Sequence, residues 1–270
     1  MPRHGNTRGQ LTISIVSHGH GGLLGRLLRD LDREASLAGV EVVLTLNLKD
    51  EITDVSPFPN LRFVVIRNDV PKGFGANHNQ AFSRCSTPWF AVLNPDLRVS
   101  GKEPFSTLIE AAQEIDRLGV IAPVVVNDAG QLEDSVRGNL TPWSLFRRHV
   151  FRRRATISVA GVASEGHPFY WLAGMCLLFD SSAYAAIGGF DSRFFLYGED
   201  YDICARIYGH GMAVALEPRC RIVHSAQRDS HRSLRHLRWH IASLLRIWSS
   251  AAFWRVTLAR RRHPPDNAIR

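Results

Sequence analysis

Three carboxylates stand close together in the second half of the chain, at Glu199, Asp200 and Asp202. Ile203 and Ile207 follow at a spacing of four, which predicts a short helix with one buried face. Residues three apart share a helix face, so Glu199 and Asp202 can lie together while Asp200 points elsewhere. Carboxylates placed in this way can act as general acids or bases. An acidic first turn that only stabilises the helix N-terminus, with Asp200 as N-cap, would have the same sequence.

A second candidate for chemistry is Asp96, in the segment Asn94-Pro95-Asp96. Pro95 ends the apolar run at 89–93, so Asp96 is displayed in a loop rather than paired in a sheet. Open α/β sheets bind ligands at the carboxyl ends of their strands, where a carboxylate can hold a divalent cation together with diphosphate oxygens. An ordinary Asn-Pro-Asp turn is the alternative. His224 follows the last apolar segment, and a lone histidine of this kind is more often structural than a ligand.

The turn Lys72-Gly-Phe-Gly75 precedes a predicted helix, where backbone N–H groups can bind a phosphate and Lys72 can add positive charge. It matches neither the Gly-x-Gly-x-x-Gly nor the Walker pattern, which disfavours dinucleotide and P-loop sites. A simple turn is the alternative. His18 and His20, in the first strand-to-helix loop, can line the same edge or reflect only a polar loop.

These candidates need a sheet to position them, and strand-like and helix-like segments alternate along the first half of the chain. The pattern predicts a mostly parallel, doubly wound α/β sheet. Strands are expected at 11–16, 40–46, 61–66, 89–93 and 120–126, and helices at 23–39, 76–86 and 104–118. Beyond residue 127 the pattern loosens. A strand-like run at 169–179 is interrupted at Gly174, a helical turn is expected at 181–187, and short strands at 212–216 and 222–223 follow the acidic helix.

The composition indicates a globular chain with a basic end. Of 270 residues 45% are apolar, which suffices for a large core, and the formal net charge is +8. Residues 219–270 hold twelve Arg against two Asp, or +10, so the remainder is close to −2. The four cysteines form no Cys-x-x-Cys pair, which disfavours a zinc ribbon and suits a reducing compartment. We see neither a signal peptide nor a run of about 18 apolar residues, and therefore expect a cytoplasmic location.

The basic end also has apolar residues at helical spacing, interleaved with Arg235, Arg238 and Arg246. A basic amphipathic helix of this kind can lie on an anionic membrane. Packing on the catalytic domain or on a second subunit, as in a homodimer, is the alternative. We expect a catalytic domain at 1–225 and a basic helical tail at 226–270. The apolar positions are Leu234, Leu237, Ile241, Leu244, Leu245 and Trp248.

In their order, these motifs make the chain resemble family 2 glycosyltransferases of the GT-A fold, particularly the rhamnosyltransferase-like branch. The resemblance runs from about residue 11 to 225, and the Asn-Pro-Asp and Glu-Asp-x-Asp segments carry most of its specificity. The motifs are Ile13-Ser-Ile-Val-Ser17, Asn68 with Gly73-Phe-Gly-Ala-Asn-His-Asn79, Leu93-Asn-Pro-Asp96, Trp171-Leu-Ala-Gly174, Gly189-Phe-Asp191, Phe194 through Asp202 with Arg206, and Pro218 through His224.

The resemblance implies an inverting, metal-assisted transfer of a sugar from a nucleoside diphosphate to an acceptor hydroxyl. Asp96 and His224 would hold Mg²⁺ or Mn²⁺, Asp200 would be the catalytic base and Glu199 its neighbour. The remaining positions fall into two groups. The donor or nucleotide site would include Ser17, His18, Asn47, Lys72, Gly73, Asn79, Asn94 and Asp96, and the sugar or acceptor pocket would be bordered by Trp171, Gly174 and Asp191.

The chain departs from the family pattern in the first two loops. The second strand ends in Asn47 without the usual preceding Asp, and the first ends Ser17-His-Gly-His20 rather than Thr-Tyr-Asn. We still expect a dTDP- or UDP-sugar donor, with rhamnose or another hexose, and a glycan or lipid-linked acceptor. We expect the enzyme on the inner face of the cytoplasmic membrane and no nucleic-acid partner. The rival hypothesis is a catalytically degenerate scaffold that serves as a basic membrane- or nucleic-acid-binding adaptor.

Overall fold

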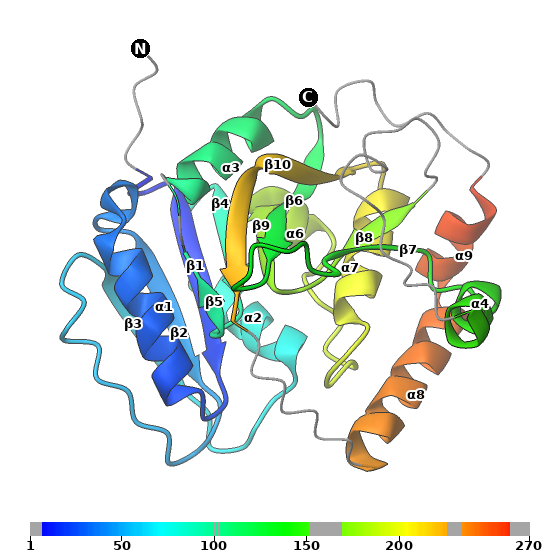
Figure 1. The fold of residues 1–270 in the computed structure, drawn as a ribbon, viewed down its shortest axis with the longest axis horizontal. Coiled ribbons are helices and arrows are strands. Elements are labelled where there is room, and N and C mark those ends of the chain that lie inside the picture. Colours follow the sequence, from blue (N-terminus) through cyan, green and yellow to red (C-terminus); the bar gives the residue numbers. More distant parts are fainter. Residues whose placement is uncertain (1–6, 100, 102, 152–168, 226–233, 260–270) are drawn as a thin grey trace.

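The computed structural model describes residues 7–99, 101, 103–151, 169–225 and 234–259. Its main sheet has eight strands in the order β3-β2-β1-β4-β9-β6-β10-β5 (Figure 1). Parallel pairing joins the first four of these and also β6 to β10, whereas β9 runs antiparallel to both β4 and β6. The strands are β1 Leu11–Ser17, β2 Glu41–Leu46, β3 Arg62–Arg67, β4 Trp89–Leu93, β5 Leu97–Arg98, β6 Leu118–Val126, β9 Cys176–Asp180 and β10 Ala213–His224. The predicted mixed α/β fold with a mainly parallel sheet is confirmed.

Helices cover both faces of this sheet, and side chains alternate between two cores along each strand, as the two-residue period of a strand requires. On β4, Ala91 and Leu93 face the core shared with α1 and α3, whereas Phe90 and Val92 face the core shared with α2, α6 and α7. The helices are α1 Gly21–Arg33, α2 Phe74–Phe82, α3 Pro104–Gln113, α4 Pro142–Phe151, α6 Ser181–Ala186, α7 Glu199–Gly209, α8 Leu234–Ser249 and α9 Ala251–Leu258, with a short 3-10 turn at Ala35–Leu37.

Two predicted segments differ in detail from the structure. The run at 169–179 does divide at Gly174, but its halves belong to different sheets. The first half, β8 (Tyr170–Leu172), pairs with β7 (Val136–Gly138), and the second, β9, enters the main sheet. The two short strands predicted near the end form the single strand β10, because a register shift between Glu217 and Arg221 absorbs the interruption at Pro218.

The C-terminal helices α8 and α9 pack against the same side of the molecule as α7 (Figure 1). Ile247, Phe253 and Val256 are buried and belong to the core that also contains α7. Part of the tail's apolar face therefore packs on the α/β unit. The predicted division of the chain at residue 225 stays a prediction, and residues 226–233 and 260–270 lie outside the described part.

Candidate functional site

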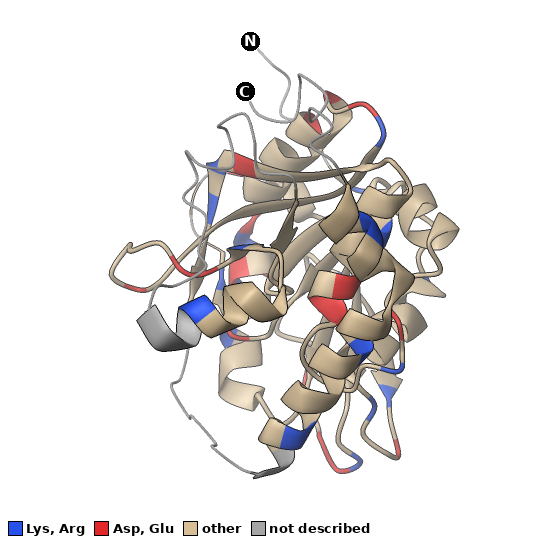
Figure 2. Cartoon of the chain, turned by 90° about the vertical axis from the view of Figure 1, so that its right-hand side faces the viewer, with Lys and Arg blue, Asp and Glu red and all other residues tan. Residues whose placement is uncertain are grey.

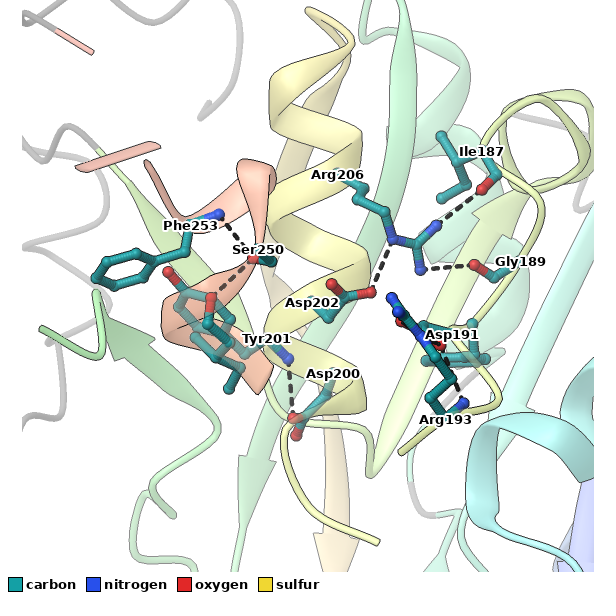
Figure 3. A network of polar contacts seen from close by, with 12 residues as sticks. Ile187, Gly189, Asp191, Arg193, Asp200, Tyr201, Asp202, Arg206, Ser250 and Phe253 are labelled. Carbon is teal, nitrogen blue, oxygen red and sulfur yellow. Dashed lines mark hydrogen bonds and ion pairs between the residues drawn. The ribbon is translucent and has the colours of Figure 1, made fainter. Parts of the chain in front are cut away.

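The acidic segment begins α7, and its first residue is Glu199. Gly198, not Asp200, is the N-cap: its φ of 87° lies in the left-handed region that favours glycine, and no side chain caps the helix. The interpretation of Asp200 as N-cap is thus wrong. Asp200 instead accepts hydrogen bonds from two backbone N–H groups, Tyr201 at 2.9 Å and Gly174 at 3.2 Å (the first is drawn in Figure 3).

Glu199 and Asp200 are adjacent carboxyl groups of low solvent exposure at the start of α7. Glu199 is only 5% exposed, and its Oε2 atom has no hydrogen-bond partner among the described residues. Burial, and after it the charge of Asp200, raises the pKa of Glu199 to about 8. Burial also raises the pKa of Asp200, against the two backbone hydrogen bonds and the charge of Arg137, which lower it. The pair therefore holds a proton more tightly than isolated carboxyls would.

The third acid of the segment, Asp202, pairs with Arg206 as predicted, but in the interior rather than on the helix surface. Arg206 Nε lies 2.7 Å from Asp202 Oδ2, and the guanidinium also donates to the carbonyls of Ile187 at 2.8 Å and Gly189 at 2.7 Å (Figure 3). Burial raises the pKa of Asp202 more than Arg206 lowers it. Arg206 therefore links α7 to the loop that follows α6, and its ion pair with Asp202 has a structural role.

The three residues predicted for the sugar or acceptor pocket lie in different surroundings. Gly174 lies directly against Asp200: its N–H donates to the carboxylate, and a Cβ added to Gly174 would stand 3.7 Å from the Asp200 Cβ atom. Trp171 is buried, donates from Nε1 to the Gly138 carbonyl at 2.9 Å and packs edge-on against Tyr201. Asp191 forms a 2.6 Å ion pair with Arg193, whose hydrogen bonds lower the pKa of Asp191.

Asp96 and His224 come together although 128 positions separate them in the chain, because β5 pairs with the end of β10. His224 Nε2 lies 3.1 Å from Asp96 Oδ2, and His224 Nδ1 lies 2.7 Å from Glu133 Oε2. The hydrogen bond to Asp96 is the main cause that raises the pKa of His224 to about 9. Sequence reasoning missed Glu133, which belongs to no motif and follows the turn at 127–131, where its N–H donates to the Val125 carbonyl.

This cluster fits the implied divalent cation. Asp96 Oδ1 is buried and has no hydrogen-bond partner among the described residues, and the Nε2 atom of His224 is directed at the same carboxylate. A carboxylate oxygen and an imidazole nitrogen are donors that Mn²⁺ accepts, and carboxylate oxygen suits Mg²⁺. Within the described residues no group of three or more His, Cys, Asp or Glu is arranged to hold an ion alone. Further ligands would then come from outside the protein, as the oxygens of a diphosphate.

Residues predicted for the nucleotide gather at the carboxyl ends of β1 and β2. The Asn47 side chain accepts from Lys72 N–H at 2.9 Å, donates to Lys72 O at 3.0 Å and lies 3.2 Å from His18 Nδ1. Ser17 donates to a carboxylate oxygen of Glu51, while the other oxygen of Glu51 is buried and lacks a partner among the described residues. Glu51 was missed by sequence reasoning, although it follows Asn47 by only four positions. It places a carboxylate beside the ends of β1 and β2.

The predicted glycine turn and Asn79 are occupied by contacts within the protein. A Cβ on Gly73 would meet the Phe195 backbone at 2.7 Å, and Phe74 N donates to Phe195 O at 3.0 Å. The first turn of α2 is therefore in contact with the segment that leads into α7. Asn79 binds both backbone groups of Phe190 and accepts from the Tyr184 hydroxyl. Lys72 Nζ donates to Gln80, and Asn94 N–H to the Met175 carbonyl at 2.9 Å.

The mixed α/β fold with its mainly parallel sheet is shared with solved glycosyltransferases of the GT-A fold. The mannosyltransferase PcManGT from Pyrobaculum calidifontis, solved with GDP-Man and Mn²⁺, superposes with a TM-score of 0.60 at 13% identity, covering 97% of this chain and 67% of that one. S. aureus TarS 1-349 with UDP-GlcNAc gives a TM-score of 0.59 at 12% identity, with 90% and 67% covered. These likenesses concern the fold alone.

Sequence comparison supports a family 2 glycosyltransferase that resembles rhamnosyltransferases. Residues 45–173 match the model of Glycosyl transferase family 2. An N-acetylglucosaminyl-diphospho-decaprenol L-rhamnosyltransferase of Mycobacterium tuberculosis is 26% identical over 298 aligned positions, which cover 94% of this chain and 92% of the relative. The rhamnosyltransferase WbbL of Escherichia coli is 32% identical over 77 positions, covering 28% of this chain and 29% of the relative. The predicted family and its enzymatic nature are confirmed.

Proposed function

We propose that the chain transfers rhamnose or another hexose from a nucleoside diphosphate to a hydroxyl of a glycan or lipid-linked acceptor, with inversion at the anomeric carbon. The observation that carries this proposal is the adjacent pair Glu199 and Asp200 at the start of α7, where two backbone N–H groups orient Asp200, together with the second polar cluster of Asp96 and His224, in a chain that matches family 2 glycosyltransferases. One carboxylate suffices for a single displacement, because the base only removes the proton of the attacking hydroxyl.

Asp200 is the proposed base. Its carboxylate is only partly exposed and is oriented by two backbone N–H groups, from Tyr201 and Gly174. Burial and the charge of Asp200 raise the pKa of Glu199 beside it to about 8, so Glu199 is protonated at neutral pH. A protonated Glu199 adds no second negative charge beside the acceptor hydroxyl from which Asp200 takes a proton.

Asp96 and His224 are the proposed holders of Mg²⁺ or Mn²⁺, with Glu133 fixing the His224 ring from the far side. When bound, the ion would neutralise charge on the departing diphosphate. The residues that would surround the donor follow the carboxyl edge of the sheet: Ser17, His18, Asn47, Lys72, Gly73, Asn79 and Asn94. Because Asn47 and Asn79 already bind protein groups, we assign them to shaping the donor site.

For the donor we propose a dTDP- or UDP-sugar and for the acceptor a lipid-linked glycan. The name of the mycobacterial relative joins rhamnose to a decaprenol-linked substrate, and TarS was solved with UDP-GlcNAc, which supports both choices. Trp171, Gly174 and Asp191 would border the sugar or acceptor. The proposed location is the inner face of the cytoplasmic membrane. None of the described helices is long and apolar enough to span a bilayer.

A thermal-shift panel of nucleotide sugars, each with and without Mn²⁺ or Mg²⁺, tests the proposal. A ligand that binds the folded state raises its stability by mass action, so the true donor should give the largest shift and lose most of it when Asp96 is changed to Ala. NMR of the product then gives the anomeric configuration. Retention of configuration, or equal shifts with and without metal, would contradict the mechanism.

A further inference from the structure

Helix α8 holds the segment that leads into the catalytic helix. On its inner face, His240 stacks on Tyr197 with ring centroids 3.7 Å apart, and Trp239 stacks on Phe195 at 4.8 Å. One turn further on, Ser243 Oγ donates to the Leu196 carbonyl at 3.4 Å. Arg246 donates to the Arg193 carbonyl, and Ile247 Cδ1 reaches within 3.0 Å of the place where Gly198 would carry a Cβ. Each residue from Phe194 to Gly198 therefore either contacts α8 or is adjacent in the chain to a residue that does.

The opposite face of α8 carries a row of large apolar side chains that nothing described in the chain covers. Leu237, Ile241 and Leu245 are 55%, 50% and 59% exposed. Their spacing of four residues places them on one face, along two turns of the helix. A surface-exposed apolar row of this length on a monomeric protein indicates an interaction site.

Neighbouring helices extend this exposed apolar surface. Trp254 and Leu258 on α9 are 51% and 71% exposed, and Trp143 and Phe146 on α4 are 66% and 53% exposed with their rings stacked. All three helices lie on one side of the molecule, which Figure 2 faces. The three helices have in common that each exposes large apolar side chains and carries at least one arginine.

The charge of this surface distinguishes between two possible partners, a second copy of the chain and an anionic bilayer. The sequences of α4, α8 and α9 contain no Asp or Glu, and Arg147, Arg238 and Arg255 are exposed. A second copy docking through a two-fold axis would place this patch against itself and so bring arginines together without acidic partners. An anionic bilayer offers the opposite charge to the arginines and an apolar interior to the leucine row.

We propose that the outer faces of α4, α8 and α9 form a docking surface for an anionic lipid bilayer, and that α8 thereby sets the catalytic pair next to the lipid surface. Only α8 lies between the segment 194–198 and the proposed docking surface. That segment would therefore lie about 10 Å, one helix diameter, from the lipid headgroups. That placement suits a lipid-linked acceptor and, in this respect only, rests on the proposed function.

Vesicle co-sedimentation of the full chain, without any donor or acceptor, tests the docking surface directly. We expect binding to vesicles of phosphatidylglycerol and phosphatidylcholine, with little binding to phosphatidylcholine alone. The triple change of Leu237, Ile241 and Leu245 to Ser should lower the partition coefficient at least tenfold. Arg238→Glu should lower it more than about fivefold, the effect expected from one basic residue, and raised salt should do the same.

Matched controls come from exposed side chains elsewhere. Ile52→Ser removes a side chain that is 85% exposed in a loop outside these helices, and Arg29→Glu reverses an exposed charge on α1; both should bind like the unchanged protein. Circular dichroism melts verify that the α8 variants remain folded. Absence of binding to anionic vesicles, or equal binding by the triple variant, would overturn the proposal. So would a stable dimer that the triple change dissolves while vesicle binding persists. Failure to find a sugar donor would leave this result untouched.

Discussion

Replacing Glu199 by a residue that cannot ionise should raise the free energy of unfolding, and the increase should grow with pH. The folded state raises the pKa of Glu199 from 4.5 to about 8, chiefly through burial. Between these values the folded chain keeps a proton that the unfolded chain has lost, so unfolding releases a proton. The free energy of unfolding therefore falls as the pH rises through this window. Glu199→Gln keeps the shape of the side chain and eliminates this loss.

The magnitude follows from the two pKa values. At about 1.4 kcal/mol per pH unit, the ceiling of the gain is about 5 kcal/mol above pH 8. Coupling to Asp200 divides the proton between the two carboxyls, and we expect a gain of about 2–4 kcal/mol at pH 9 and almost none at pH 5. The Oε2 atom of Glu199 lacks a described partner, so the substitution breaks no hydrogen bond there.

Urea unfolding followed by circular dichroism at pH 5, 7 and 9 measures the effect. Glu217→Gln is the matched control, because burial raises the pKa of Glu217 but the hydrogen bonds and charge of Arg219 outweigh it and lower the pKa overall. This variant should lose a similar amount of stability at all three pH values, since Glu217 is ionised throughout. If Glu199→Gln were equally or less stable at pH 9 than the unchanged protein, the fold would not raise the pKa of Glu199, this acid would be ionised at neutral pH, and the separation of roles would be refuted.

Three further predictions concern the residues around the acids. Glu133→Gln should weaken Mn²⁺ binding about 10–100-fold in a titration calorimetry measurement, because Glu133 orients His224; unchanged affinity would deny that role. Arg206→Ala should lower the free energy of unfolding by about 3–5 kcal/mol, since it leaves Asp202 buried and unpaired, and Arg206→Ala combined with Asp202→Ala should recover part of this loss in urea melts. Gly198→Ala should lower the free energy of unfolding by about 1–2 kcal/mol, because the φ of Gly198 is 87° and Ile247 lies close to it. A urea melt like that of the unchanged protein would contradict this.

Sequence periodicity predicted the sheet well because its strands are short apolar runs bounded by turns. Even the Trp89–Leu93 strand ends where Pro95 indicates. Its antiparallel member β9 could not be anticipated, since the direction of a strand depends on where the chain re-enters the sheet after 127. The single strand β10 was split in the prediction because Pro218 and Arg219 interrupt the apolar pattern, and a register shift tolerates such an interruption.

The site was only partly predictable, for a similar reason. Asp200, Asp96 and His224 belong to recognisable motifs, so the sequence alone locates them. Glu51 and Glu133 have no motif: one is near Ser17 and the other near His224 only because the fold brings distant loops together. The occupation of Asn79 by Phe190 and Tyr184 was equally hidden, since a side-chain hydrogen bond to a loop 111 residues away leaves no local pattern.

The most direct test of the central claim compares Asp200→Asn with the unchanged protein in two assays on one donor. Transfer to the acceptor hydroxyl should fall by about 10²–10⁴-fold, the usual contribution of a general base, while the dissociation constant of the donor stays within about threefold. Loss of both together would make Asp200 a donor-binding residue. Transfer at the rate of the unchanged protein would show that another group takes the acceptor's proton and would contradict the account.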